Sequence, residues 1–185
     1  VITVPANFNE LARRATITAG KIAGLNVKRI VNEPTAAAIY YAHSKKIEGR
    51  ILVFDLGGGT LDVTILEVHG DDIDILISEG ARHLGGNNFD EALLNVLARE
   101  YKTKNSAELY KNERQKARST QTAEDAKRML SKVKQVSETI GNEEDGIARI
   151  EVSREMFERA VSRLFTRSVM LVEQALDSID LTEKD

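Results

Sequence analysis

The stretch that decides the fold is Asp55-Leu56-Gly57-Gly58-Gly59-Thr60-Leu61-Asp62, which lies between two apolar runs. The run before it, 51–54, and the run after it, 61–68, are rich in Ile, Leu and Val, as is typical of buried strands. Three successive glycines between two strands permit a sharp turn and let the backbone approach a ligand closely. The stretch therefore predicts a strand–loop–strand unit whose loop can bind a ligand.

The chemistry of this loop favours a phosphate group. Successive backbone N–H groups that face one concavity attract anions, and the Thr60 hydroxyl can donate as well. Asp55 and Asp62 bracket the loop and can face a hydrated magnesium ion, while one of them can orient an attacking water. It differs from a Walker loop, because no Gly-Lys-Ser/Thr follows and a strand continues the chain. A glycine-rich hairpin without a ligand is the alternative, and the flanking acids count against it.

The segments before the loop predict alternating strands and helices. An apolar strand covers 1–4, and Asn9 then caps a helical pattern that ends at Gly24. A short strand is predicted over 27–31, and a second helix begins at 33–35. This order favours an α/β fold.

The segments after the loop predict strands first and helices later. Ile73, Ile75 and Ile77 share one face of a strand, so 51–77 indicates an antiparallel meander with a turn at 70–72. Beyond it, the pattern predicts a helix over about 88–101, a charged segment over 102–135 whose latter part is helical, a polar turn over 141–146, a strand over 147–152 and a final helix capped by Ser153.

Two further segments are candidates for nucleotide contacts. Gly85 and Gly86 stand where a helix begins, and a helix N-terminus attracts anions. Four polar residues share one helix face at spacings of three and four: Glu124, Lys127, Arg128 and Ser131. Such a face can grip a ribose and an adenine by hydrogen bonds and by a cation stacked on the ring. Taken alone, a simple turn and a solvated charged face are the better interpretations of these two segments.

Composition excludes several classes of function. The formal net charge of the 185 residues is -3, so neither nucleic acid nor a membrane is expected as a partner. There is no cysteine, and the three histidines are too scattered for a zinc site. The chain shows no signal peptide or membrane-spanning run, and a cytoplasmic location is expected, with an organelle lumen as the alternative. A buried strand at the first residue, which is not Met, indicates a fragment.

Four motifs then resemble the seventy-kilodalton heat-shock chaperone family (heat shock protein 70) in their order and spacing. They are Val1-Ile2-Thr3-Val4-Pro5-Ala6, Asn32-Glu33-Pro34-Thr35-Ala36-Ala37-Ala38, Asp55-Leu56-Gly57-Gly58-Gly59-Thr60 and His83-Leu84-Gly85-Gly86. The resemblance implies an actin-like ATPase (ribonuclease H-like) fold, seen here as lobe II with the end of subdomain IA. It implies that 1–47 ends subdomain IA, 48–84 begins IIA, 85–161 forms IIB and 162–185 returns to IIA.

The resemblance also implies roles for individual residues. Asp55, Asp62 and Glu33 correspond to catalytic acids that face magnesium, through water. Phosphate contacts fall on Gly57, Gly58, Gly59 and Thr60, and adenosine contacts on Gly85, Gly86, Glu124, Lys127, Arg128 and Ser131. Pro5 and Arg13 resemble a switch and relay that report the nucleotide state to a substrate-binding domain.

The implied function is an ATPase chaperone that couples ATP binding and hydrolysis to the binding and release of unfolded polypeptides. Its implied partners are those clients, a J-domain co-chaperone and a nucleotide exchange factor on subdomain IIB. The family's first phosphate loop and catalytic lysine would lie before Val1, and its last adenosine-binding turn after Asp185. The 185 residues alone are therefore expected to be inactive.

The chain departs from the family pattern at a few positions, and two other classes of function share some of its motifs. Asn7 and Leu61 stand where aromatic residues are usual, and 87–88 is Asn-Asn in place of an acidic pair. An actin-like filament protein of the bacterial rod-shape type shares several motifs but lacks the long charged helical insertion. A sugar kinase of the same superfamily is the third candidate, although no sugar-binding constellation is recognisable.

Overall fold

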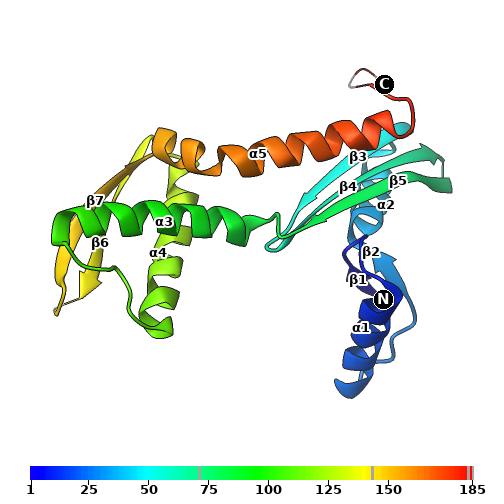
Figure 1. The fold of residues 1–185 in the computed structure, drawn as a ribbon. Coiled ribbons are helices and arrows are strands. Elements are labelled where there is room, and N and C mark those ends of the chain that lie inside the picture. Colours follow the sequence, from blue (N-terminus) through cyan, green and yellow to red (C-terminus); the bar gives the residue numbers. More distant parts are fainter. Residues whose placement is uncertain (71, 143, 183, 185) are drawn as a thin grey trace. The chain divides into compact units, whose positions relative to one another are not determined.

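The computed structural model describes residues 1–70, 72–142, 144–182 and 184 (Figure 1). Asp71 and Glu143, which fall in the two predicted turns, lie outside the described residues. The chain divides into two compact units: a first unit of 1–85 with 167–185, and a second unit of 86–166. The first unit carries the glycine-rich loop and the second carries the charged helix. No helix in the described part of the chain is long and apolar enough to cross a membrane.

The first unit opens with a strand–helix–strand–helix series: β1 (Ile2–Val4), α1 (Glu10–Ile22), β2 (Ile30–Asn32) and α2 (Glu33–Lys45). The side chain of Asn9 caps α1 as predicted, because its Oδ1 accepts a hydrogen bond of 2.9 Å from the Ala12 N–H. β1 and β2 pair in parallel. The strand predicted over 27–31 is placed too early, because β1 offers ladder partners only to 30–32.

The rest of the first unit is the predicted antiparallel meander. It consists of β3 (Gly49–Leu56), β4 (Thr60–His69) and β5 (Asp72–Arg82), with β4 in the centre. One face of the sheet packs on α2, where the small side chains of Ala38 and Ala42 meet Leu66 and Val68. Burial of this apolar surface fixes the register of β4, since a shift by one residue would turn its apolar side chains away from α2. That register places Asp62 opposite Asp55.

The second unit consists of α3 (Gly86–Asn105), α4 (Glu113–Leu130), the hairpin of β6 (Gln135–Asn142) and β7 (Gly146–Ser153), and the first part of α5 (Arg154–Asp177). The apolar face of α3 packs on α4 and on the hairpin in one core that includes Leu97, Tyr101 and Leu130. The predicted cap is confirmed, since the Ser153 hydroxyl accepts a hydrogen bond from the Met156 N–H. β6 is absent from the sequence prediction, because only Val136 and Ile140 of that strand are buried and they stand four residues apart.

Candidate functional site

The glycine-rich loop is a tight turn between β3 and β4. The Gly57 N–H donates a hydrogen bond of 2.9 Å to the Thr60 carbonyl, so four residues reverse the chain. Gly58 and Gly59 are exposed, and nothing lies within 4 Å of the place where a side chain of Gly59 would begin. None of 57–59 is in the left-handed region of φ, so the turn does not require glycine for its backbone angles, contrary to the sequence argument.

A close backbone contact supplies the reason for glycine instead. A Cβ atom built on Gly85 would lie 2.6 Å from the Gly58 carbonyl oxygen and 2.7 Å from the Gly59 nitrogen. The segment that leads into α3 therefore rests directly on the backbone of the loop. Only a residue without a side chain fits there. Gly85, predicted as an adenosine contact, also supports the loop predicted to hold phosphate.

Three carboxylates gather beside the loop in the first unit. Asp55 and Asp62 face each other across β3 and β4, and Glu33 begins α2. Burial raises the pKa of Glu33, and the negative charges of Asp55 and Asp62 raise it further. Burial is also the main cause that raises the pKa of Asp62, with a further rise from Asp55, while hydrogen bonds from the Asn7 backbone and the Thr60 side chain oppose it. The structure thus brings together the three predicted acids.

This arrangement suits a hydrated divalent cation. Like charges that repel one another in a partly buried site are stabilised when a cation shares them. Among the described residues, no group of three or more acidic or histidine side chains could hold a metal ion by itself. Magnesium keeps several waters and needs few carboxylates, so contact through water fits Glu33, Asp55 and Asp62.

Arg13 ties the turn after β1 to the start of α2. Its guanidinium donates hydrogen bonds to the carbonyls of Phe8 and Ala6, each 3.0 Å long, and one of 2.8 Å to Asn32 Oδ1. The Phe8 N–H in turn donates to the Pro5 carbonyl. Arg13 therefore holds the Pro5 turn against Asn32, the residue that precedes Glu33.

The predicted adenosine-contacting residues of the second unit meet at one end of α3 and along α4. Lys127 Nζ lies 3.5 Å from the Gly86 carbonyl oxygen and 2.6 Å from a carboxylate oxygen of Asp90. Arg128 and Glu124 form an ion pair one turn apart, and the Ser131 hydroxyl donates to the Arg128 carbonyl. Asp90, a buried acid one turn into α3, was missed because a single acid in an apolar stripe carries no clear signal.

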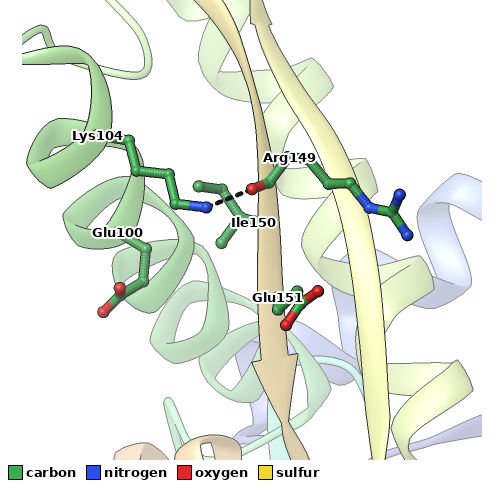
Figure 2. Close-up of a pocket in the computed structure, with 5 residues that line it drawn as sticks. All are labelled: Glu100, Lys104, Arg149, Ile150 and Glu151. Carbon is green, nitrogen blue, oxygen red and sulfur yellow. Dashed lines mark hydrogen bonds between the residues drawn. The ribbon is translucent and has the colours of Figure 1, made fainter.

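A separate pocket of the second unit, about 320 Å³ in volume, contains none of the predicted site residues (Figure 2). It lies between α3 and β7 and is lined by Glu100, Lys104, Arg149, Ile150 and Glu151. The Lys104 ammonium points into it and donates to the Arg149 carbonyl at 2.6 Å. Lys104 thus satisfies a backbone carbonyl of β7, and the mixed charges around it favour no single class of ligand.

Comparison with known proteins gives one consistent result. The family model described as "Hsp70 protein" matches residues 1–185. A chaperone protein dnaK of Cyanidium caldarium is 45% identical over all of this chain and 31% of its own length. A chaperone protein DnaK of Prochlorococcus marinus is 45% identical over 98% of this chain, and one of Phaeodactylum tricornutum is 43% identical over all of it. The chain spans about a third of the length of these relatives.

Proposed function

Because the chain belongs to the Hsp70 family, we propose that the protein containing it is an ATP-dependent chaperone, and that these residues form part of its ATPase domain. The α/β architecture is that of the actin-like ATPase fold of this family. The observation that carries the proposal is the cluster of Glu33, Asp55 and Asp62 beside the glycine-rich loop, within a family match over the whole chain. Neither a filament protein nor a sugar kinase stands among the relatives described above.

We infer distinct roles in nucleotide binding and hydrolysis for the residues of the first unit. The loop 57–60 binds phosphate through its backbone N–H groups and the Thr60 hydroxyl. Magnesium, when bound, supplies positive charge that offsets the charge of the phosphates. Asp55, Asp62 and Glu33 hold its water shell, and Asp62 also accepts a hydrogen bond from the attacking water. Pro5 and Arg13 relay the state of the site through the Asn32 contact.

The second unit is assigned to the nucleoside. One side of an adenosine pocket is formed by Gly86, Lys127, Arg128, Glu124 and Ser131, with the ammonium of Lys127 held in place by Asp90. Gly85, which precedes Gly86 in the chain, is a further proposed adenosine contact. One side of a pocket buries only part of a ligand, so the chain alone should bind ADP weakly, with a Kd on the order of tens of micromolar to millimolar.

The whole protein is proposed to bind unfolded polypeptides, to be stimulated by a J-domain co-chaperone and to release ADP with an exchange factor on 85–161. The subdomain boundaries given above remain part of this proposal. A cytoplasmic location is proposed, with an organelle lumen as the alternative.

The test is an assay of ATP hydrolysis by the intact protein that contains this chain, with and without Mg²⁺, followed by refolding of a denatured enzyme with ATP. We expect hydrolysis that requires Mg²⁺ and ATP-dependent refolding. Sedimentation of filaments with ATP, or phosphate transfer to a sugar, would contradict the proposal in favour of the other two classes. Titration of ADP into the isotope-labelled chain should shift the resonances of Gly85, Gly86 and 124–131, and shifts elsewhere would exclude this helix face.

A further inference from the structure

A polar side chain that no predicted role uses lies against Asp62. Apart from Asp90, which is paired with Lys127, three buried side-chain oxygens in the described part of the chain have no hydrogen-bond partner: Asn7 Oδ1, Thr35 Oγ1 and Asp62 Oδ1. Asp62 is only 1% exposed. Leaving one oxygen of a buried carboxylate without a hydrogen-bond partner costs folding free energy. The polar groups next to Asp62 Oδ1 are therefore candidates for a missing donor.

The surroundings of Gly80 identify the polar group nearest to Asp62 Oδ1. In β5, Gly80 is the ladder partner of Asp62. A Cβ atom built on Gly80 would lie 2.7 Å from Asn7 Nδ2 and 2.8 Å from Asp62 Oδ1. The amide nitrogen of Asn7 and the unpartnered oxygen of Asp62 therefore both pack against Gly80, at the place that a side chain of residue 80 would occupy. An amide N–H and a carboxylate oxygen are complementary as donor and acceptor.

The backbone of the same residue also lies near the carboxylate. The Asn7 N–H lowers the pKa of Asp62, opposing the rise caused by burial, while Asp62 Oδ1 has no hydrogen-bond partner. A carboxylate held at one oxygen can still rotate about its bond to Cβ, whereas a carboxylate held at both oxygens cannot. The second contact would fix the direction that Asp62 presents to the magnesium and the attacking water.

We propose that Asn7 is a positioning residue for Asp62, and that its side-chain amide holds Asp62 Oδ1 where both groups pack against Gly80, directly or through one water. The geometry of this inference rests on the contacts around Gly80. Its effect on ATP hydrolysis rests on the proposed ATPase function. Gly80 takes part because it has no side chain that would displace either group.

The kinetic test uses Asn7→Leu and Asn7→Asp in the intact protein. Both remove the amide donor, and Asn7→Asp keeps the shape of the side chain in case Asn7→Leu folds poorly. We expect kcat for ATP hydrolysis to fall roughly tenfold in each, with KM for ATP unchanged. Gly80→Ala should act in the same direction, and the double variant Asn7→Leu/Gly80→Ala should be no worse than either alone. Asn26→Leu, at an exposed position of the first unit, is the matched control and should retain parental kcat.

A structural test separates this inference from the proposed function. A crystal structure of the intact protein should show Asp62 Oδ1 bonded to the Asn7 amide or to one water shared with it, and Asn7→Leu should change the side-chain rotamer of Asp62. An unchanged Asp62 rotamer in Asn7→Leu, or parental kcat in both Asn7 variants, overturns the inference. Absence of hydrolysis by the parental protein would instead reject the proposed function, and the rotamer of Asp62 would still decide the role of Asn7.

Discussion

The two units hold their charged side chains in opposite ways. In the first unit, the negative charge of Asp55 raises the pKa of Glu33 and of Asp62, in addition to the rise that burial causes, and the charge of Asp62 raises the pKa of Glu33 further. In the second unit, the charges that were predicted to contact adenosine are paired with partners of opposite sign, Lys127 with Asp90 and Arg128 with Glu124. A cluster of like charges opposes folding and is kept where a ligand needs it, whereas a neutralised pair can serve structure as well as binding. The first unit should therefore lose function before stability when it is altered, and the second unit the reverse.

The largest effect should come from Asp62→Asn in the intact protein. The substitution keeps the shape of the side chain but removes the charge that we propose faces magnesium and the attacking water. We expect kcat for ATP hydrolysis to fall about 100-fold, while the melting temperature stays the same or rises. The assay is steady-state hydrolysis with thermal unfolding measured in parallel. Parental hydrolysis by Asp62→Asn would remove Asp62 from the site, and a fall in melting temperature would break the contrast between the units.

Gly85→Ala should have the second-largest effect on ATP hydrolysis. The added methyl group would lie 2.6 Å from the Gly58 carbonyl oxygen, so the loop or the segment before α3 must move. We expect hydrolysis to fall roughly tenfold and the affinity for ATP to fall with it, because the loop loses its place against the phosphates. Gly24→Ala, outside the site and with no atom within 4 Å of the new methyl group, controls for the loss of a glycine. Its left-handed φ of 78° should cost stability without changing kinetics.

In the second unit, Lys127→Met should act mainly on stability. It leaves the buried Asp90 without its partner, and an unpaired buried carboxylate is costly. We expect the free energy of unfolding of the chain to fall by about 2 kcal/mol in urea titrations. Arg128→Met is the matched control on the same helix, because the Arg128 side chain is 69% exposed and should matter by less than about 1 kcal/mol. Equal losses in the two variants would show that the Asp90 pair is no stronger than a surface pair.

The smallest effect should be a pH dependence that belongs to the first unit. Glu33 and Asp62 have pKa values above their ordinary 4.5 and 3.8 in the folded chain, so the folded state binds protons more readily than the unfolded state. Their contribution to stability is therefore complete below those ordinary values and is lost as the pH rises through the folded pKa values. In buffer without divalent cations, Asp62→Asn should have a higher unfolding free energy than the parent, and this difference should grow as the pH rises. Added Mg²⁺ should make the difference in unfolding free energy smaller. If the difference in unfolding free energy between Asp62→Asn and the parent does not change with pH, the proposed repulsion among the carboxylates is contradicted.

Much of the fold was predictable because it follows local patterns. The apolar runs on either side of 57–59, the period-two isoleucines of β5 and the caps at Asn9 and Ser153 each gave the correct element. The misplaced strand at 27–31 and the missed β6 show the limit of such patterns. β2 extends only as far as its ladder partner β1, which is distant in the sequence. β6 was missed because its own buried residues, Val136 and Ile140, stand four residues apart.

The sequence by itself determined the family and the α/β class and indicated the three acids as candidates, because these depend on motifs of a few neighbouring residues and on their order. Only the tertiary structure decided which residues meet. The backbone contact of Gly85 with Gly58, the partner of Lys127 in Asp90 and the approach of Asn7 to Asp62 over Gly80 all join segments at least 27 residues apart. Register and helix packing bring such segments into contact. A contact that depends on a glycine having no side chain leaves no local pattern in the sequence.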